Sequence, residues 1–326
     1  MPFDMNELKY QNPVYDGYFA DPFVLRTRGK YFAYGTGPTN NPGRAIPVLS
    51  SPDLIHWTSH GGALELLTQP PANNYWAPEV AEKNGKYLLY YSASTSDSDA
   101  DQRLRVAMGD RPEGPFRDSG KMLLPEMGFT IDADPFIDPR DGKAYLFFCM
   151  DYERDEPTGT GICVVQLNDQ MTAATSEPRM VVRASADWQI YERNRDYKGR
   201  VWPKWNCVEG PSVIYHEGKY YCFYSGGAWH GKDYGVEVAI ADHPLGQWND
   251  ERALTGPSVL KAIPGKVIGP GHNSVVRGPD GKSWVMVYHA WNADHTLRRM
   301  CIDPIIWTDQ GPKVDGPSTE FRSLQT

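Results

Sequence analysis

Carboxylate and imidazole side chains recur at five points of the chain, each next to a short run of β-forming residues. They are Asp21, Glu79, Asp132 with Asp134, Glu209 and His272, and a Pro lies within two residues of most of them. Carboxyl groups that are held close together repel as anions, so one ionises while another keeps its proton. Such a pair supplies a general base and a general acid at one pH, and two carboxyl groups are the usual means of hydrolysing a glycosidic bond.

The elements that would position these groups come from an internal repeat. A Gly turn followed by an aromatic-rich run returns five times, as Gly29-Lys-Tyr-Phe-Ala-Tyr34, Gly85-Lys-Tyr-Leu-Leu-Tyr-Tyr91, Gly142-Lys-Ala-Tyr-Leu-Phe-Phe148, Gly218-Lys-Tyr-Tyr-Cys-Phe-Tyr224 and Gly281-Lys-Ser-Trp-Val-Met-Val-Tyr288. A tight turn containing Gly between two β-rich runs indicates a hairpin. The polar residues above open the first strand of each hairpin.

Five such units predict an all-β fold, a five-bladed β-propeller of about four strands per blade, as a single domain over residues 1–326. A β-sandwich of irregular hairpins is the alternative. Because the innermost strands of a propeller line its central channel, the polar groups should meet in one axial pocket. The longest interval between repeats holds a polar segment at 185–205, which we expect to form a loop extension.

Composition excludes several classes of function. The net charge is −8 without a basic stripe, so we expect no nucleic-acid partner. No apolar run is long enough to cross a membrane. The N-terminal segment lacks a signal-peptide pattern, which predicts a cytoplasmic protein unless a leader was removed. Five Cys without paired spacing argue against a disulfide framework, and no zinc motif occurs. Four of them lie in apolar or aromatic runs and are expected in the core: Cys149, Cys163, Cys222 and Cys301.

The order of motifs resembles glycoside hydrolase family 43 along nearly the whole chain. The matching segments are Ala20-Asp-Pro-Phe-Val24, Trp76-Ala-Pro-Glu-Val80, Ile131-Asp132 before Phe136, Val208-Glu-Gly-Pro211 and Gly269-Pro-Gly-His-Asn-Ser274, followed by Arg298 five residues before Asp303. Each motif is short, but five in the family's order are specific.

The resemblance implies inversion with Asp21 as general base, Glu209 as general acid and Asp132 tuning the acid's pKa. If the blades are aligned on their Gly turns, Asp134 and not Asp132 takes the position of Asp21. We prefer Asp132 for the role of tuning the acid. Trp76, His272 and Arg298 would bind the sugar, with a calcium ion or a water beside His272. No cofactor is required, the partner is a carbohydrate, and the oligomeric state stays open.

For the substrate, the resemblance favours exo release of terminal α-L-arabinofuranose, and β-D-xylosidase and β-D-galactofuranosidase activities are the alternatives. Trp202 and Trp205 are candidates for the leaving-group side, or ordinary core aromatics. A retaining fructan-cleaving propeller would need Asn-Asp-Pro-Asn and Glu-Cys motifs, which are absent. A sugar-binding propeller without activity is disfavoured by the intact Asp21, Asp132 and Glu209.

Overall fold

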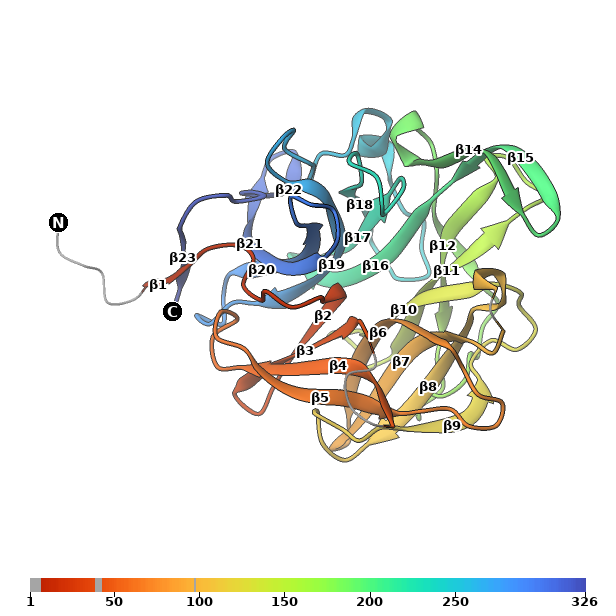
Figure 1. Cartoon of the computed structure of the whole chain (residues 1–326), viewed down its shortest axis with the longest axis horizontal. Helices are drawn as coiled ribbons and strands as arrows, with labels where there is room; N and C mark the ends of the chain where they lie inside the picture. Colours follow the sequence, from red (N-terminus) through yellow and green to blue (C-terminus); the bar gives the residue numbers. More distant parts are fainter. Residues whose placement is uncertain (1–6, 39–42, 97) are drawn as a thin grey trace.

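Five antiparallel sheets stand around a central axis in the computed structural model, which describes residues 7–38, 43–96 and 98–326 (Figure 1). The predicted all-β five-bladed β-propeller is confirmed. Residues 1–6, where the segment without a signal-peptide pattern begins, lie outside the described ranges. Among the described residues, no helix has the length and apolar character needed to cross a membrane. A single domain over residues 1–326 stays a prediction.

The first two blades have four strands each, paired in sequence order. Blade 1 consists of β2 (Ala20–Thr27), β3 (Lys30–Thr36), β4 (Arg44–Ser51) and β5 (Thr58–Glu65). Blade 2 consists of β6 (Asn74–Lys83), β7 (Lys86–Ser94), β8 (Arg103–Gly109) and β9 (Arg117–Met122). Both blades have the predicted number of strands.

The remaining blades vary this plan. Blade 3 has β10 (Thr130–Ile137), β11 (Ala144–Tyr152), β12 (Gly159–Gln166) and β13 (Arg179–Arg183), and its sheet continues into β15 (Arg200–Asn206) and β14 (Ile190–Tyr197). Blade 4 has three strands, β16 (Val208–His216), β17 (Lys219–Gly226) and β18 (Gly235–Ala241). Blade 5 has β19 (Ile268–Arg277), β20 (Trp284–Trp291), β21 (Arg298–Thr308) and β22 (Gly311–Val314). In blade 4, isolated bridges from Asn249 and Leu260 to β18 stand in place of a fourth strand.

The segment at 185–205 is mainly a hairpin, so the prediction of a loop extension is wrong for most of its length. Lys198 and Gly199 join β14 to β15 and have φ of 54° and 72°. Two successive residues with positive φ form the type I′ turn that suits a two-residue hairpin loop. The Lys198 ammonium is held by Asp151 and Glu153 of blade 3 at 2.9 and 2.6 Å, which fastens the hairpin to its blade.

The core consists of five apolar clusters, each of which lies between two neighbouring blades. Between blades 1 and 2, for example, Tyr34 and Val48 pack against Leu89 and Tyr91, all at most 1% exposed. Truncating a buried aromatic side chain to Ala typically costs about 3–5 kcal/mol, so these clusters fix how adjacent blades sit. The five Cys are all free and buried, which confirms the prediction for Cys149, Cys163, Cys222 and Cys301 and adds Cys207 to the core.

The ring is closed by the two ends of the described chain. Strand β1 (Glu7–Tyr10) pairs antiparallel with β23 (Arg322–Gln325), and both lie beside blade 5 (Figure 1). The Tyr10 hydroxyl donates a hydrogen bond of 2.8 Å to the buried Asp303 of β21. In Figure 1 the first strands of the blades, β2, β6, β10, β16 and β19, lie nearest the middle of the molecule. The polar residues of the sequence motifs therefore come from the innermost strands.

Candidate active site

Each innermost strand carries a β-bulge near its start. In each strand a bulge residue has a left-handed backbone, with φ between 42° and 57°: Asp21, Ala77, Asp132, Gly210 and His272. Strand β19 has a second register shift, where Gly269 has φ of 50°. Bulges redirect side chains, and a left-handed conformation at a residue other than Gly costs free energy that the surroundings must supply. The fivefold bulge therefore aims the residues at these positions out of the sheet plane and towards the axis.

Side chains satisfy the backbone N–H groups that four of the bulges withdraw from the strand ladder. Asp21 N–H donates to His289 Nδ1 at 3.1 Å, Ala77 to Thr36 Oγ1 at 2.8 Å, Gly210 to Asp132 Oδ2 at 2.9 Å and His272 to Ser225 Oγ at 2.7 Å. Buried backbone donors need such partners, so these bonds hold the bulges in shape. At Gly210 a Cβ atom would also stand only 3.1 Å from the His272 ring.

The sequence suggested that the polar groups occupy one equivalent position in all five blades, and this holds for only three of them. Asp21, Asp132 and His272 are the left-handed residues of their bulges. Glu209 comes one residue before its bulge, and Glu79 comes after its bulge. Counting back from the Gly turn selects the wrong aspartate in blade 3, Asp134 in place of Asp132. The reason is that six residues join β10 to β11, whereas two residues join β2 to β3.

A cavity of about 310 Å³ opens at these strand starts, and it contains all six residues predicted for the site. Its lining residues are Tyr18, Asp21, Thr36, Trp76, Ala77, Asp99, Ile131, Asp132, Tyr191, Glu209, Trp229, His272 and Arg298. Asp134 does not line this cavity. Its carboxylate instead accepts a hydrogen bond from Val213 N at 2.7 Å and interacts with Glu79. The geometry thus places Asp132 at the site and Asp134 behind it.

Asp21 is 8% exposed and is surrounded by basic side chains. Its Oδ1 atom accepts a hydrogen bond of 3.0 Å from Arg298 Nη1 and lies 3.4 Å from His272 Nδ1. Burial would raise the pKa of Asp21, but the charges of Arg298 and His272 outweigh it and hold that pKa well below its ordinary value. Asp21 is therefore an anion at neutral pH, as a general base must be.

Glu209 is also 8% exposed, and its two oxygens have different donors. The Tyr234 hydroxyl donates to Oε1 at 2.7 Å, and the Cys207 thiol donates to Oε2 at 3.2 Å. Tyr234 is 1% exposed, and its ring stacks on the His289 imidazole with an interplanar angle of 6°. His289 accepts a hydrogen bond from the Asp21 backbone N–H. The stacked rings of Tyr234 and His289 therefore contact both Glu209 and Asp21.

The pKa of Asp132 depends on the charges of both other carboxyl groups, Asp21 and Glu209. Burial, opposed by His272 and by the N–H of Gly210 and aided by the charges of Glu209 and Asp21, raises the pKa of Asp132 to about 7. The imidazole of His272 faces both aspartates, with Nε2 at 4.0 Å from Asp132 Oδ1. The pKa of His272 is raised, since the three carboxylates outweigh its burial. The site thus combines one anionic carboxylate with a second carboxyl group that can hold a proton near neutral pH.

Aromatic and cationic side chains form the wall around these groups. Trp76 comes from β6, and Tyr191 comes from the β14–β15 hairpin. The guanidinium of Arg298 lies over the Trp229 ring at 4.5 Å and donates to the Tyr18 hydroxyl at 2.9 Å. Aromatic faces beside charged hydrogen-bonding groups suit a sugar ring, which has apolar C–H faces and polar edges.

Trp202 and Trp205 do not line the cavity. Both are buried in the hairpin region, 4% and 1% exposed, and pack against each other at 5.3 Å between ring centroids. Of the two alternatives left open by the sequence, the structure favours ordinary core aromatics.

Several residues of the site were missed from the sequence. Trp229 follows two glycines in Ser225-Gly-Gly-Ala-Trp229, a loop signal that could have suggested it as a site residue. Tyr191 lies in the polar segment at 185–205, from which only Trp202 and Trp205 were considered as site residues. Tyr234 and His289 lie outside all five opening motifs, and only coordinates show that they contact the carboxyl groups.

Comparison with known proteins decides the family. Residues 10–312 match the family model described as glycosyl hydrolases family 43. The chain belongs to glycoside hydrolase family 43. It is therefore an inverting O-glycosyl hydrolase. The chain is similar to a solved thermostable family-43 glycoside hydrolase, with a TM-score of 0.81 and 32% identity over 95% of this chain and 97% of that one.

Two curated relatives of this family 43 enzyme have different activities. Beta-D-galactofuranosidase xynD of Aspergillus niger is 29% identical over an alignment that covers 93% of this chain and 84% of the relative. An extracellular exo-alpha-(1->5)-L-arabinofuranosidase of Streptomyces chartreusis is 27% identical over an alignment that covers 86% of this chain and 82% of the relative. The two relatives are both glycosidases but differ in the sugar named in their activity, so the similarity assigns the reaction class and leaves the sugar open.

Calcium beside His272 stays a prediction for this family 43 enzyme. Calcium takes six to eight oxygen ligands. In the described ranges, no group of three or more His, Cys, Asp or Glu side chains is arranged to hold a metal ion. Both ring nitrogens of His272 face carboxylates, as given above, and we assign the ion no catalytic step.

Proposed function

We propose that the protein is an exo-acting α-L-arabinofuranosidase in which Asp21 is the general base and Glu209 the general acid. The observation that carries the proposal is that these two carboxyl groups line one small cavity of about 310 Å³. This volume is at the small end of ligand pockets, which favours one terminal sugar over a long stretch of polymer.

In the proposed mechanism the terminal sugar lies between Asp21 and Glu209. Glu209 gives its proton to the leaving oxygen, while Asp21 takes a proton from a water that attacks the anomeric carbon from the opposite face. In its ionised form Asp132 places negative charge near the acid, and its bond from Gly210 N–H orients it. His272 and Arg298 bind the sugar hydroxyls, and Trp76 packs on the ring.

Tyr191 supports the exo mode. It belongs to the β14–β15 hairpin, an addition to blade 3 that the other blades lack, and it closes one side of the cavity. Similarity to the Streptomyces exo-arabinofuranosidase favours the same activity. The Aspergillus relative makes β-D-galactofuranosidase the second candidate, since galactofuranose is also a five-membered ring sugar.

Proton NMR of the fresh product from 4-nitrophenyl α-L-arabinofuranoside tests the proposal. We expect β-arabinofuranose as the first product, because inversion changes the anomeric configuration. Parallel assays with the nitrophenyl β-D-xyloside and β-D-galactofuranoside compare kcat/KM across the candidate sugars. A higher kcat/KM for either of these substrates overturns the arabinofuranosidase assignment.

Tyr234→Phe is expected to lower kcat on an arabino-oligosaccharide by roughly 2–12-fold, because a net hydrogen bond of about 0.5–1.5 kcal/mol to Glu209 is lost. The loss should be smaller on the nitrophenyl glycoside, whose leaving group needs little help from the acid. Tyr221→Phe, on the same blade and without a bond to the site, is the matched control. An equal loss on both substrates would assign Tyr234 a structural role only.

A further inference from the structure

A second cavity, of about 1020 Å³, lies on the same face of the propeller as the active site. Its walls come from Trp188, from the loop at 227–234 after β17, from the segment at 257–268 and from the loop at 292–297 after β20. In the strand register, Gly226 pairs with Val208 and Trp291 pairs with Ile268. Both loops therefore leave their blades where the innermost strands begin, which is the face of the active site.

The two cavities share a wall. Trp229 lines the active-site cavity, and its neighbour His230 lines the outer cavity. The His230 ring also packs edge-on against Tyr191 of the active-site wall, at 5.4 Å between centroids. A saccharide chain that leaves the active site over Trp229 or Tyr191 therefore enters the outer cavity.

The outer cavity combines apolar surface with positive charge. Its apolar lining includes Trp188, Pro257, Ile263, Pro264 and Val267. Its charged side chains are Lys232, Lys261, Lys266 and one carboxylate, Asp233. The three lysines are exposed, and within the described ranges none of them forms an ion pair.

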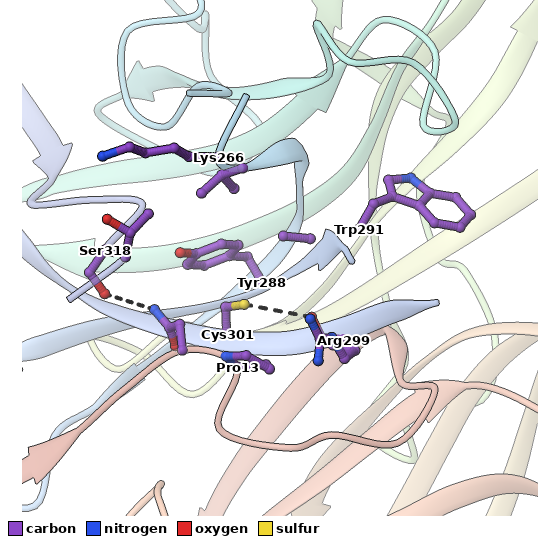
Figure 2. A pocket seen from close by; sticks show the side chains of 11 residues that line it. Pro13, Lys266, Tyr288, Trp291, Arg299, Cys301 and Ser318 are labelled. Atoms are coloured by element: carbon purple, nitrogen blue, oxygen red, sulfur yellow. Dashed lines mark hydrogen bonds between the residues drawn. The ribbon is translucent and has the colours of Figure 1, made fainter. Parts of the chain in front are cut away.

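This local excess of positive charge stands out on a chain whose net charge is −8. Lys266 also lines an adjoining cavity of about 210 Å³, where the other cation, Arg299, is paired with Asp16 at 3.6 Å (Figure 2). Cations that have no carboxylate partner attract an anionic ligand, and the Trp, Pro and Ile surfaces suit the apolar faces of sugar rings.

We propose that the outer cavity binds hexuronate units, which are sugar rings that carry a carboxylate, in the polysaccharide whose terminal sugar enters the active site. The proposal rests on the proposed function, because it gives the substrate of that function an acidic backbone. Each carboxylate pairs with a lysine at the rim, and the ring behind it packs on the apolar floor. A neutral polysaccharide would form no ion pair with the three ammonium groups.

Binding can be tested apart from catalysis by titration calorimetry of the intact protein at low ionic strength. The probes are an α-1,4-galacturonate oligomer and a glucuronoxylan oligomer, which distinguish the two common sources of hexuronate, and each is compared with its carboxyl-reduced form. We expect carboxyl reduction to weaken binding of at least one acidic oligomer by about tenfold or more, and added salt to weaken it as well.

Lys232→Glu combined with Lys261→Glu should weaken binding of the acidic oligomer by about tenfold or more, since two attractive charges become repulsive. Lys30→Glu is the matched control, because Lys30 is exposed at the β2–β3 turn on the opposite face. Thermal denaturation checks that each variant is folded.

Two results would overturn the proposal: no binding of either acidic oligomer, or equal affinity for the acidic and the carboxyl-reduced forms. An unchanged affinity in the folded double variant would overturn it as well. Hexuronate binding without hydrolysis of any nitrophenyl glycoside would instead contradict only the proposed function, because calorimetry requires no turnover.

Discussion

Glu209→Gln should lower kcat on an arabino-oligosaccharide by about 10²–10⁴-fold, the usual contribution of a positioned general acid. The amide keeps the shape of the carboxyl group and can still accept the Tyr234 hydroxyl bond, so the fold should survive. It cannot donate a proton to the leaving oxygen, whose departure as an alkoxide is then the difficult step.

The leaving group makes this expectation specific to the acid role. Nitrophenolate is a stable anion and departs with little protonation, so Glu209→Gln should lose much less activity on the nitrophenyl glycoside. Glu217→Gln, at an exposed turn of the same blade, is the matched control and should behave as the wild type. If the variant lost the same factor on both substrates, Glu209 would not be the general acid.

The sequence predicted the propeller because its signals are local and repeated. Each Gly turn lies between the first two strands of a blade, and three of these turns, at Gly29, Gly85 and Gly218, are two-residue turns with positive φ at both positions. The aromatic-rich run after each turn forms the second strand, buried between blades. Repetition of one local pattern was enough to fix the class of fold.

The prediction was less accurate within the site, because register there depends on bulges. A bulge adds a residue that changes which side chains face the axis, and nothing in the residue pattern announced it. Glu79 therefore looked equivalent to Asp21, yet the left-handed residue of its bulge is Ala77. Glu79 instead interacts with Asp134, and burial with this neighbouring charge raises its pKa well above the ordinary value.

Contacts between distant segments were beyond the reach of sequence patterns. Tyr234 and His289 are 55 residues apart, and the ring stack between them forms only when blades 4 and 5 meet. The hydrogen bond from Tyr234 to Glu209 and the bond from Asp21 N–H to His289 connect the two catalytic candidates through this stack. The spacing of the motifs predicted which carboxyl groups meet, whereas their support comes from tertiary packing.

Asp21→Asn should lower kcat by about 10²–10⁴-fold on every glycoside, nitrophenyl substrates included, because activation of the attacking water does not depend on the leaving group. This uniform loss separates a general base from the general acid discussed above. The substitution also leaves Arg298 without its buried anionic partner, which acts at 3.0 Å in the wild type. Thermal denaturation must therefore accompany the kinetics, with the exposed Asp169→Asn as the matched control.

Azide distinguishes loss of the base from loss of structure. It is an anion that attacks without giving up a proton, so it needs no general base and should restore turnover of the nitrophenyl glycoside by Asp21→Asn. The nitrophenolate leaves as azide forms its bond to the anomeric carbon, and the product is the glycosyl azide of inverted configuration. Azide should not accelerate the wild type, in which Asp21 already activates water. A folded variant that azide fails to rescue, or that turns over at the wild-type rate, would remove Asp21 from the role of base, and with it the assignment of opposite faces of the sugar to Asp21 and Glu209.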